Sequence, residues 1–169
     1  MYIYRFLQLN TARLNNVRIF PYAISDRCGV GILYAPKSFL TAISSLKNVH
    51  SYYLLSDRHV VKIRVPMITL DRYISRCGEP PTFIKIDVEG AEDLVVSGGI
   101  ETLKRFRPRV SMEVWGDPLP SDAHLKAAEK LQELGYQPYR ILSNGSLERI
   151  SLKDLKSVKG FDNVVFQIP

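Results

Sequence analysis

An apolar strand that ends in carboxylates and a glycine narrows the possible folds of this chain more than any other segment. Residues 82–90 read Thr-Phe-Ile-Lys-Ile-Asp-Val-Glu-Gly, and a helical pattern, Ala-Glu-Asp-Leu-Val-Val, follows at once. Enzymes with an α/β fold place their ligands at the carboxyl ends of parallel strands, where a strand leads into a helix. The segment therefore predicts an α/β protein with its site directly after this strand.

Strand and helix patterns alternate along the rest of the chain, which predicts a mostly parallel sheet with helices on both faces. Pro21 indicates that its strand is a sheet edge or is bulged. Residues 36–58 have the weakest pattern, and we expect a long surface loop or a lid there. The expected helices are 2–15, 69–77, 91–106 with a break at Gly98-Gly99, and one that Ser121 caps and Gly135 ends; the expected strands are 17–26, 29–34, 60–65, 82–88, 109–115, 139–142 and 163–168.

Three acids are candidates for chemistry. Asp87 and Glu89 are two residues apart at a strand end, so extended geometry points them to the same side, and Glu113 is expected near the end of the neighbouring strand. Acids in this place can orient a cationic cofactor, bind a metal or accept a proton from a hydroxyl group. The alternative is that they cap the helix that starts near Gly90, where negative charge is favourable by about 0.3–1 kcal/mol.

Length and cysteine usage argue against a disulfide-stapled domain, a zinc-binding domain and a thioredoxin-like protein. A chain of 169 residues fits one domain that buries a core without disulfides or metals. Cys28 and Cys77 stand alone, and the three histidines (His50, His59 and His124) lie at unrelated spacings, so no metal site is predicted and no histidine is assigned a role. The cysteine usage and the short apolar stretches favour a cytoplasmic protein that does not enter the membrane.

The positive charge is concentrated in the first half of the chain. Residues 1–80 contain 11 Lys and Arg against 4 Asp and Glu, whereas residues 81–169 contain 12 against 13, for a net charge of +6. A nucleic-acid-binding domain would lose affinity steeply with salt, but no nucleic-acid-binding motif accompanies the charge. We therefore interpret it as a solvated basic surface and expect no nucleic-acid partner.

Four motifs in order give the chain a specific resemblance. They are Ala-Ile-Ser-Asp at 23–26, Thr-Leu-Asp-Arg-Tyr-Ile at 69–74, Ile-Lys-Ile-Asp-Val-Glu-Gly-Ala-Glu at 84–92 and Arg-Pro-Arg-Val-Ser-Met-Glu-Val-Trp at 107–115. Together they resemble the FkbM family of S-adenosylmethionine-dependent methyltransferases. The resemblance implies that residues 1–169 are a single domain with a Rossmann-like class I methyltransferase fold.

The resemblance also implies an activity and a site. The activity is transfer of the sulfonium methyl group of S-adenosylmethionine to a hydroxyl of a small molecule or sugar. Ser25 and Asp26 would bind the cofactor near its adenine, Asp87 would lie near its methionine end, and Glu89 and Glu113 would face the acceptor. Such a transfer needs the hydroxyl in line with the S–CH3 bond and a carboxylate to take its proton. Trp115 is expected either to line the acceptor pocket or to be a half-buried core residue.

One family feature is absent from this sequence. Members begin with a strand and an Asp-x-Gly-x-x-x-Gly turn that holds the cofactor, but no glycine precedes Gly29 here. We therefore expect a carboxyl-terminal portion of the fold, without its first strands, that binds S-adenosylmethionine weakly or not at all. In the family's strand order, 3-2-1-4-5-7-6, strands 1 and 2 would separate residues 17–24 from 84–88. The sheet should thus be incomplete, or rearranged so that 17–24 lies beside 83–88.

Two further expectations follow from an incomplete sheet. An open strand edge favours pairing with a second copy of the chain. The alternative to an enzyme is a methyltransferase remnant without activity that serves as a binding or assembly module. Replacing Asp87 and Glu89 by their amides discriminates between these, because only the enzyme would be affected.

Overall fold

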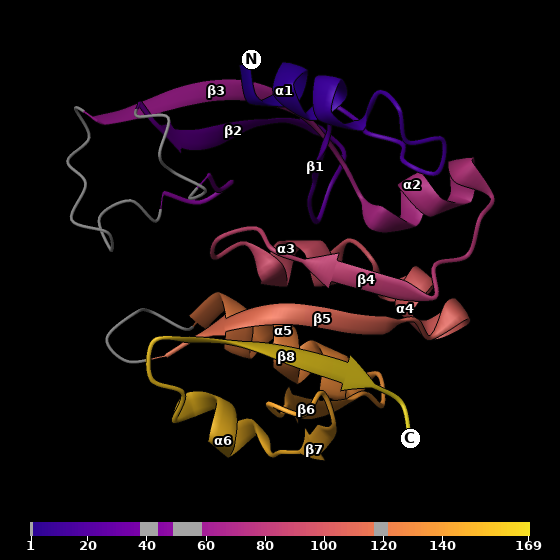
Figure 1. Cartoon of the computed structure of the whole chain (residues 1–169), viewed down its shortest axis with the longest axis vertical. Helices are drawn as coiled ribbons and strands as arrows, with labels where there is room; N and C mark the ends of the chain where they lie inside the picture. Colours follow the sequence, from indigo (N-terminus) through magenta and orange to yellow (C-terminus); the bar gives the residue numbers. More distant parts are fainter. Residues whose placement is uncertain (1, 38–43, 49–58, 117–121) are drawn as a thin grey trace.

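The computed structural model describes residues 2–37, 44–48, 59–116 and 122–169. Two sheets lie towards opposite ends of its long axis (Figure 1). The helices are α1 (Tyr2–Thr11), α2 (Leu70–Cys77), α3 (Glu92–Ser97), α4 (Ile100–Phe106), α5 (Asp122–Glu133) and α6 (Leu152–Lys156). The strands are β1 (Ala23–Ile24), β2 (Gly29–Pro36), β3 (Val60–Ile68), β4 (Phe83–Ile86), β5 (Arg109–Trp115), β6 (Gln137–Ile141), β7 (Leu147–Arg149) and β8 (Phe161–Gln167).

The five-stranded sheet has the order β4-β5-β8-β6-β7. β4 and β5 are parallel, whereas the other three pairs are antiparallel. The prediction of a mostly parallel sheet is therefore wrong for the described strands. The short turn between β6 and β7 explains one of these pairs, because such a turn can join only antiparallel strands. The first four strands, β4-β5-β8-β6, agree with the 4-5-7-6 part of the family's expected order. β7 is a further strand at the edge.

The helices of this half cover one face of the five-stranded sheet. Val110, Met112 and Val114 of β5 are fully buried in a core to which α3, α4, α5 and α6 all contribute. The opposite face is partly open, since Phe83 and Phe161 are 55% and 69% exposed while Ser111 and Val165 on this face are buried. Helices on both faces are therefore not found among the described residues. The apolar sides of α3 and α6 pack on α5, so these helices form one layer.

The three-stranded sheet is separate and has the order β1-β3-β2. β1 is parallel to β3, and β2 is antiparallel to it. The alternative that residues 17–24 pair beside 83–88 is therefore wrong. The expected strand 17–26 forms a ladder only at Ala23–Ile24, which fits the missing amide hydrogen of Pro21.

Helix α1 is shorter than expected and its apolar side is uncovered. It ends at Thr11, and Phe6, Leu7 and Leu9 are between 45% and 65% exposed. The expected burial of an amphipathic face is therefore not found within the described parts of the chain. None of the described helices combines the length and hydropathy that a transmembrane helix requires.

The predicted helix break is the junction between the two halves of the molecule. Thr69 caps α2 by accepting the Arg72 amide hydrogen at 3.1 Å. The Asp71 carboxylate then accepts the backbone N–H of Glu101 and Thr102, at 3.2 and 2.7 Å, and so caps α4. Helices 69–77, 91–97 and 100–106 and strand 109–115 are confirmed. The cap expected at Ser121 and most of the loop or lid expected at 36–58 lie outside the described residues.

Gly98 lies against the backbone of Ser25 at this junction. A Cβ atom there would collide with the Ser25 carbonyl oxygen. The backbone of Gly98, with φ −79° and ψ −1°, would itself accept any residue. The absence of a side chain is therefore required by the contact alone.

We predict that Gly98→Ala lowers the free energy of unfolding by about 1–3 kcal/mol, because the added methyl group overpacks the junction. Urea unfolding followed by circular dichroism measures the loss. Lys126→Ala, at an exposed position of α5, is the control and should change stability little. A Gly98→Ala protein as stable as that control would contradict the close contact.

Candidate functional site

The loop between β4 and α3 carries two of the predicted acids. β4 ends at Ile86, and the chain bends at Glu89, which has a φ of 54°, and at Gly90, with a φ of 89°. Asp87 and Glu89 are therefore brought together by a tight bend rather than by the alternation of an extended strand. The parallel register pairs Ile86 with Met112, which places Glu113 of β5 beside Asp87.

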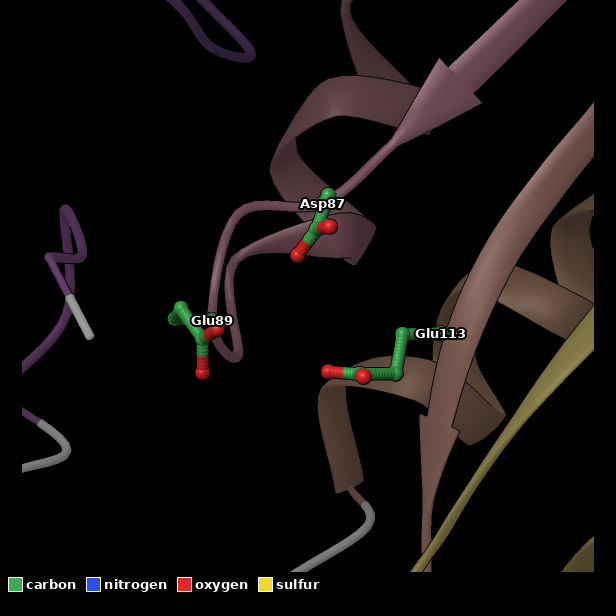
Figure 2. A group of neighbouring side chains, drawn as sticks. All are labelled: Asp87, Glu89 and Glu113. Carbon is green, nitrogen blue, oxygen red and sulfur yellow. The ribbon is translucent and has the colours of Figure 1, made fainter. Parts of the chain in front are cut away.

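The three acids form an acid cluster, defined as Asp87, Glu89 and Glu113. One carboxylate oxygen from each lies within 4.8 Å of the others, and the side chains converge from the loop and from β5 (Figure 2). The predicted convergence is thus confirmed in geometry. Lys85 Nζ lies 3.5 Å from Asp87 Oδ2 and offsets part of the negative charge.

The cluster has the chemistry to hold a cation or take up a proton. Asp87 is exposed, while Glu89 and Glu113 are half-buried, so the group is open to a ligand from solvent. Three carboxylates this close can bind a metal ion or an organic cation, and any one of them can act as a general base. Proximity of acids alone does not select among these uses.

Asp87 and Glu89 precede α3, which starts at Glu92. The residue before the helix is Ala91, which makes no side-chain capping bond, and the acids of its first turn are Glu92 and Asp93. The charge-based capping alternative for Asp87 and Glu89 stays a prediction. Their carboxylates lie close to that of Glu113 at the strand ends.

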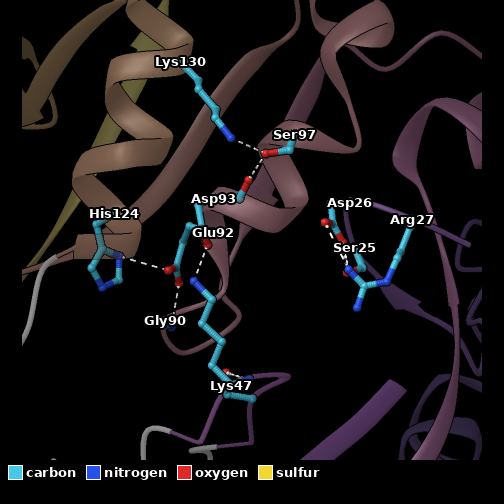
Figure 3. A network of polar contacts seen from close by, with 11 residues as sticks. Ser25, Asp26, Arg27, Lys47, Gly90, Glu92, Asp93, Ser97, His124 and Lys130 are labelled. Carbon is cyan, nitrogen blue, oxygen red and sulfur yellow. Dashed lines mark hydrogen bonds and ion pairs between the residues drawn. The ribbon is translucent and has the colours of Figure 1, made fainter. Parts of the chain in front are cut away.

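Glu92 turns back towards the loop and is almost completely buried. Its Oε1 accepts the backbone N–H of Gly90 at 3.1 Å, and its Oε2 lies 3.2 Å from Nδ1 of His124 on α5 (Figure 3). We call Glu92 and His124 the buried pair; their side chains are 1% and 0% exposed. Burial raises the pKa of Glu92 to about 7 and lowers the pKa of His124 to about 4, so both groups favour their neutral forms.

Trp115 connects the buried pair to the acid cluster. Its ring lies 4.8 Å from the His124 ring, and its Nε1–H donates to Glu113 Oε2 at 2.8 Å. The side chain is 2% exposed, so Trp115 is a core residue more fully buried than the half-buried alternative. Trp115 therefore orients the carboxylate of Glu113 and does not form an open wall of an acceptor pocket.

A second polar group ties α3 to its neighbours. Lys47, from the segment 44–48, forms a 2.6 Å ion pair with Asp93. The Ser97 hydroxyl donates to the Asp93 carbonyl oxygen and accepts from Lys130 of α5. These contacts hold α3 from both sides (Figure 3).

Ser25 and Asp26 lie away from the acid cluster. The Ser25 hydroxyl donates to Asp26 Oδ1 at 3.1 Å, and Arg27 approaches the same carboxylate at 3.4 Å. The Ser25 backbone packs against Gly98, beyond the C-terminal end of α3, whereas the acid cluster precedes its N-terminal end. The structure therefore brings together Asp87, Glu89 and Glu113 but does not bring Ser25 or Asp26 to them.

Sequence reasoning missed the buried pair and Lys47. The spacing of the histidines gives His124 no role, and its partner Glu92 is distant in sequence and on another helix. Burial of His124 on the apolar side of α5, between Ala123 and Ala127, was the available signal.

The buried pair predicts opposite pH dependences for two variants. Between pH 4.5 and 7 folded Glu92 keeps a proton that the unfolded chain releases, so its contribution to stability falls as pH rises. Between pH 4 and 6.5 His124 stays deprotonated in the folded protein but binds a proton in the unfolded chain, so its contribution to stability rises with pH. The two slopes offset each other in the wild type.

We therefore expect the free energy of unfolding of Glu92→Gln, taken relative to that of the wild type, to increase by about 2 kcal/mol between pH 4.5 and 6.5. For His124→Asn the same difference should decrease by about 2 kcal/mol. Urea unfolding at the two pH values measures both differences. Glu133→Gln, at an exposed position, should follow the wild type. If the free energy of unfolding depends on pH in the same way in the wild type and in all three variants, the proposed pKa shifts of the buried pair are contradicted.

Comparison with known proteins identifies the family of the chain. The family model of the methyltransferase FkbM domain matches residues 4–138, which include every residue of the acid cluster and the buried pair. No curated protein and no solved structure matches the chain. Because the match covers well over half of the sequence, this chain belongs to the FkbM methyltransferase domain family.

Proposed function

We propose that the chain is an S-adenosylmethionine-dependent O-methyltransferase that acts on a hydroxyl of a small molecule or sugar. The observation that carries the proposal is the convergence of Asp87, Glu89 and Glu113 at the carboxyl end of β4. This is the position where α/β enzymes bind ligands. Membership of a methyltransferase family supports the reaction class.

The residues of the acid cluster fit a positively charged cofactor. A sulfonium carries a positive charge, and the cluster offers three carboxylates, of which the exposed Asp87 is the most accessible. When bound, S-adenosylmethionine supplies its methyl group to the acceptor oxygen and leaves as the neutral thioether. Asp87 would attract the methionine end, Glu89 and Glu113 would orient the acceptor, and one of these two would take the hydroxyl proton.

Ser25 and Asp26 have a separate place in the proposal. They are proposed to contact the adenine end of the cofactor, although they lie past the opposite end of α3 from the acid cluster. Arg27 already pairs with Asp26. Replacement of Asp26 should therefore weaken binding less than replacement of Asp87.

The proposal predicts that S-adenosylmethionine perturbs the amide resonances of residues 87–90 in a titration followed by NMR, which detects affinities as weak as the millimolar range, on the order of −4 kcal/mol. Asp87→Asn should abolish these changes because it removes the most accessible negative charge. Glu133→Gln, which removes an exposed charge elsewhere, should leave them intact. An unperturbed spectrum with excess ligand would overturn the proposal.

One observation favours the second candidate, a binding or assembly module. Within the described residues β4 has a strand neighbour on one side only, and Phe83 beside that open edge is 55% exposed. Open apolar edges favour pairing with another chain. A second copy of this chain is the partner that this candidate implies.

The second candidate predicts a dimer in multi-angle light scattering, which Phe83→Lys converts to a monomer by charging the edge. Phe161→Lys, a matched change on β8, should leave the dimer intact. Asp87→Asn with Glu89→Gln should also leave it intact, since assembly does not use the acid cluster. A wild-type protein that is monomeric at all concentrations would exclude this candidate.

A further inference from the structure

Two ionisable side chains are buried where the proposed reaction does not use them. Glu92 and His124 are 1% and 0% exposed, and Glu92 Oε2 and both ring nitrogens of His124 make no well-aligned hydrogen bond within the described parts of the chain. Such burial costs stability, because polar groups lose water without full compensation. The position of the two groups between the loop and β5 suggests what they do there.

The first contact fixes the loop. Glu92 Oε1 accepts the Gly90 N–H at 3.1 Å, and Gly90 directly follows Glu89. Glu89 itself has a positive φ of 54°, which is unfavourable for a residue with a side chain. The hydrogen bond from Gly90 to Glu92 therefore holds the bend that presents Asp87 and Glu89.

The second contact joins the loop to α5 and β5. Nδ1 of His124 lies 3.2 Å from Glu92 Oε2, and the His124 ring lies against Trp115 with the planes tilted by 51°. Trp115 donates in turn to Glu113 Oε2 at 2.8 Å. An unbroken series of contacts thus runs from Gly90, beside one acid of the cluster, to the carboxylate of another.

The charged groups around the buried pair come from three elements. Asp93 belongs to α3, Glu89 to the loop and Lys47 to the segment 44–48. Lys47 is engaged with Asp93, and Glu113 with Trp115. His124 also lies near the backbone of Glu113, so the contacts of the buried pair are directed at the loop, at Trp115 and at β5.

We infer that Glu92 and His124 are positioning residues that fix the loop of Asp87 and Glu89 relative to Glu113. The inference rests on the proposed function for its effect on cofactor affinity, and on the contacts alone for the coupling of loop and strand. A buried pair with a purely structural role would stabilise the fold but would leave the ligand affinity of the folded protein unchanged.

Trp115 is the one tryptophan of the sequence, so its indole N–H gives a single cross-peak in a ¹⁵N–¹H correlation spectrum. Glu92→Ala removes the contacts to Gly90 and His124 and should shift this peak, although Glu92 does not touch Trp115 in the contacts described above. Glu92→Gln keeps an acceptor for Gly90 and a polar group towards His124, and should restore the peak. Glu101→Ala, on the exposed side of α4, is the matched control.

The reciprocal variant tests the same coupling from the other side. His124→Phe keeps a ring against Trp115 but loses the contact with Glu92, so the amide peak of Gly90 should shift. The inference is overturned if the indole peak in Glu92→Ala and the Gly90 peak in His124→Phe both remain where the control leaves them. If only one of these two variants folds, the peak measured in that variant decides whether the coupling exists.

Titration with S-adenosylmethionine separates this inference from the proposed function. Affinity should fall about tenfold in Glu92→Ala, because a misplaced loop presents Asp87 poorly, and should recover in Glu92→Gln. If the wild type does not bind the ligand, the proposed function fails, while the two peaks still decide the coupling. If the peaks shift but affinity is unchanged, the coupling stands and its role in the site is wrong.

Discussion

The parallel pairing of β4 with β5 determines where the candidate functional groups lie. Its register sets Ile86 opposite Met112, so that the loop after β4 opens beside Glu113. A shift of one residue would turn Glu113 to the other face of the sheet, into the core formed with the helices. The acid cluster is therefore a consequence of strand register, and the helical layer that buries Val110, Met112 and Val114 fixes that register.

The candidate site contains groups that lower the stability of the fold, and packing elsewhere in the molecule supports them. Glu89 has a left-handed backbone, three carboxylates lie close together, and the ionisable side chains of Glu92 and His124 are buried. Strained or desolvated groups persist where surrounding packing determines them, and they gather at functional sites. The packing of α3 on α5 and the Gly98 junction supply that support here.

Local patterns predicted the elements around the site, but not how they assemble. Thr69 and Gly78 mark the ends of α2 through capping chemistry that is local. Gly98-Gly99 marks the break between α3 and α4, although the contact that requires glycine at position 98 is with the distant Ser25. The convergence of Asp87, Glu89 and Glu113 also followed from strand ends, although Glu89 reaches the others through a bend. The antiparallel pairing of β8, the uncovered face with Phe83 and the buried pair depend on contacts distant in sequence, which periodicity does not encode.

The most direct test of the account is a crystal structure of the protein soaked with S-adenosylhomocysteine, the product that the proposed cofactor becomes when it has given up its methyl group. The account predicts the ligand's amino-acid end beside Asp87, with the carboxylate oxygens of Asp87, Glu89 and Glu113 within about 5 Å of one another as in Figure 2. Carboxylates that point away from one another, or a ligand bound at a place remote from the end of β4, would contradict it.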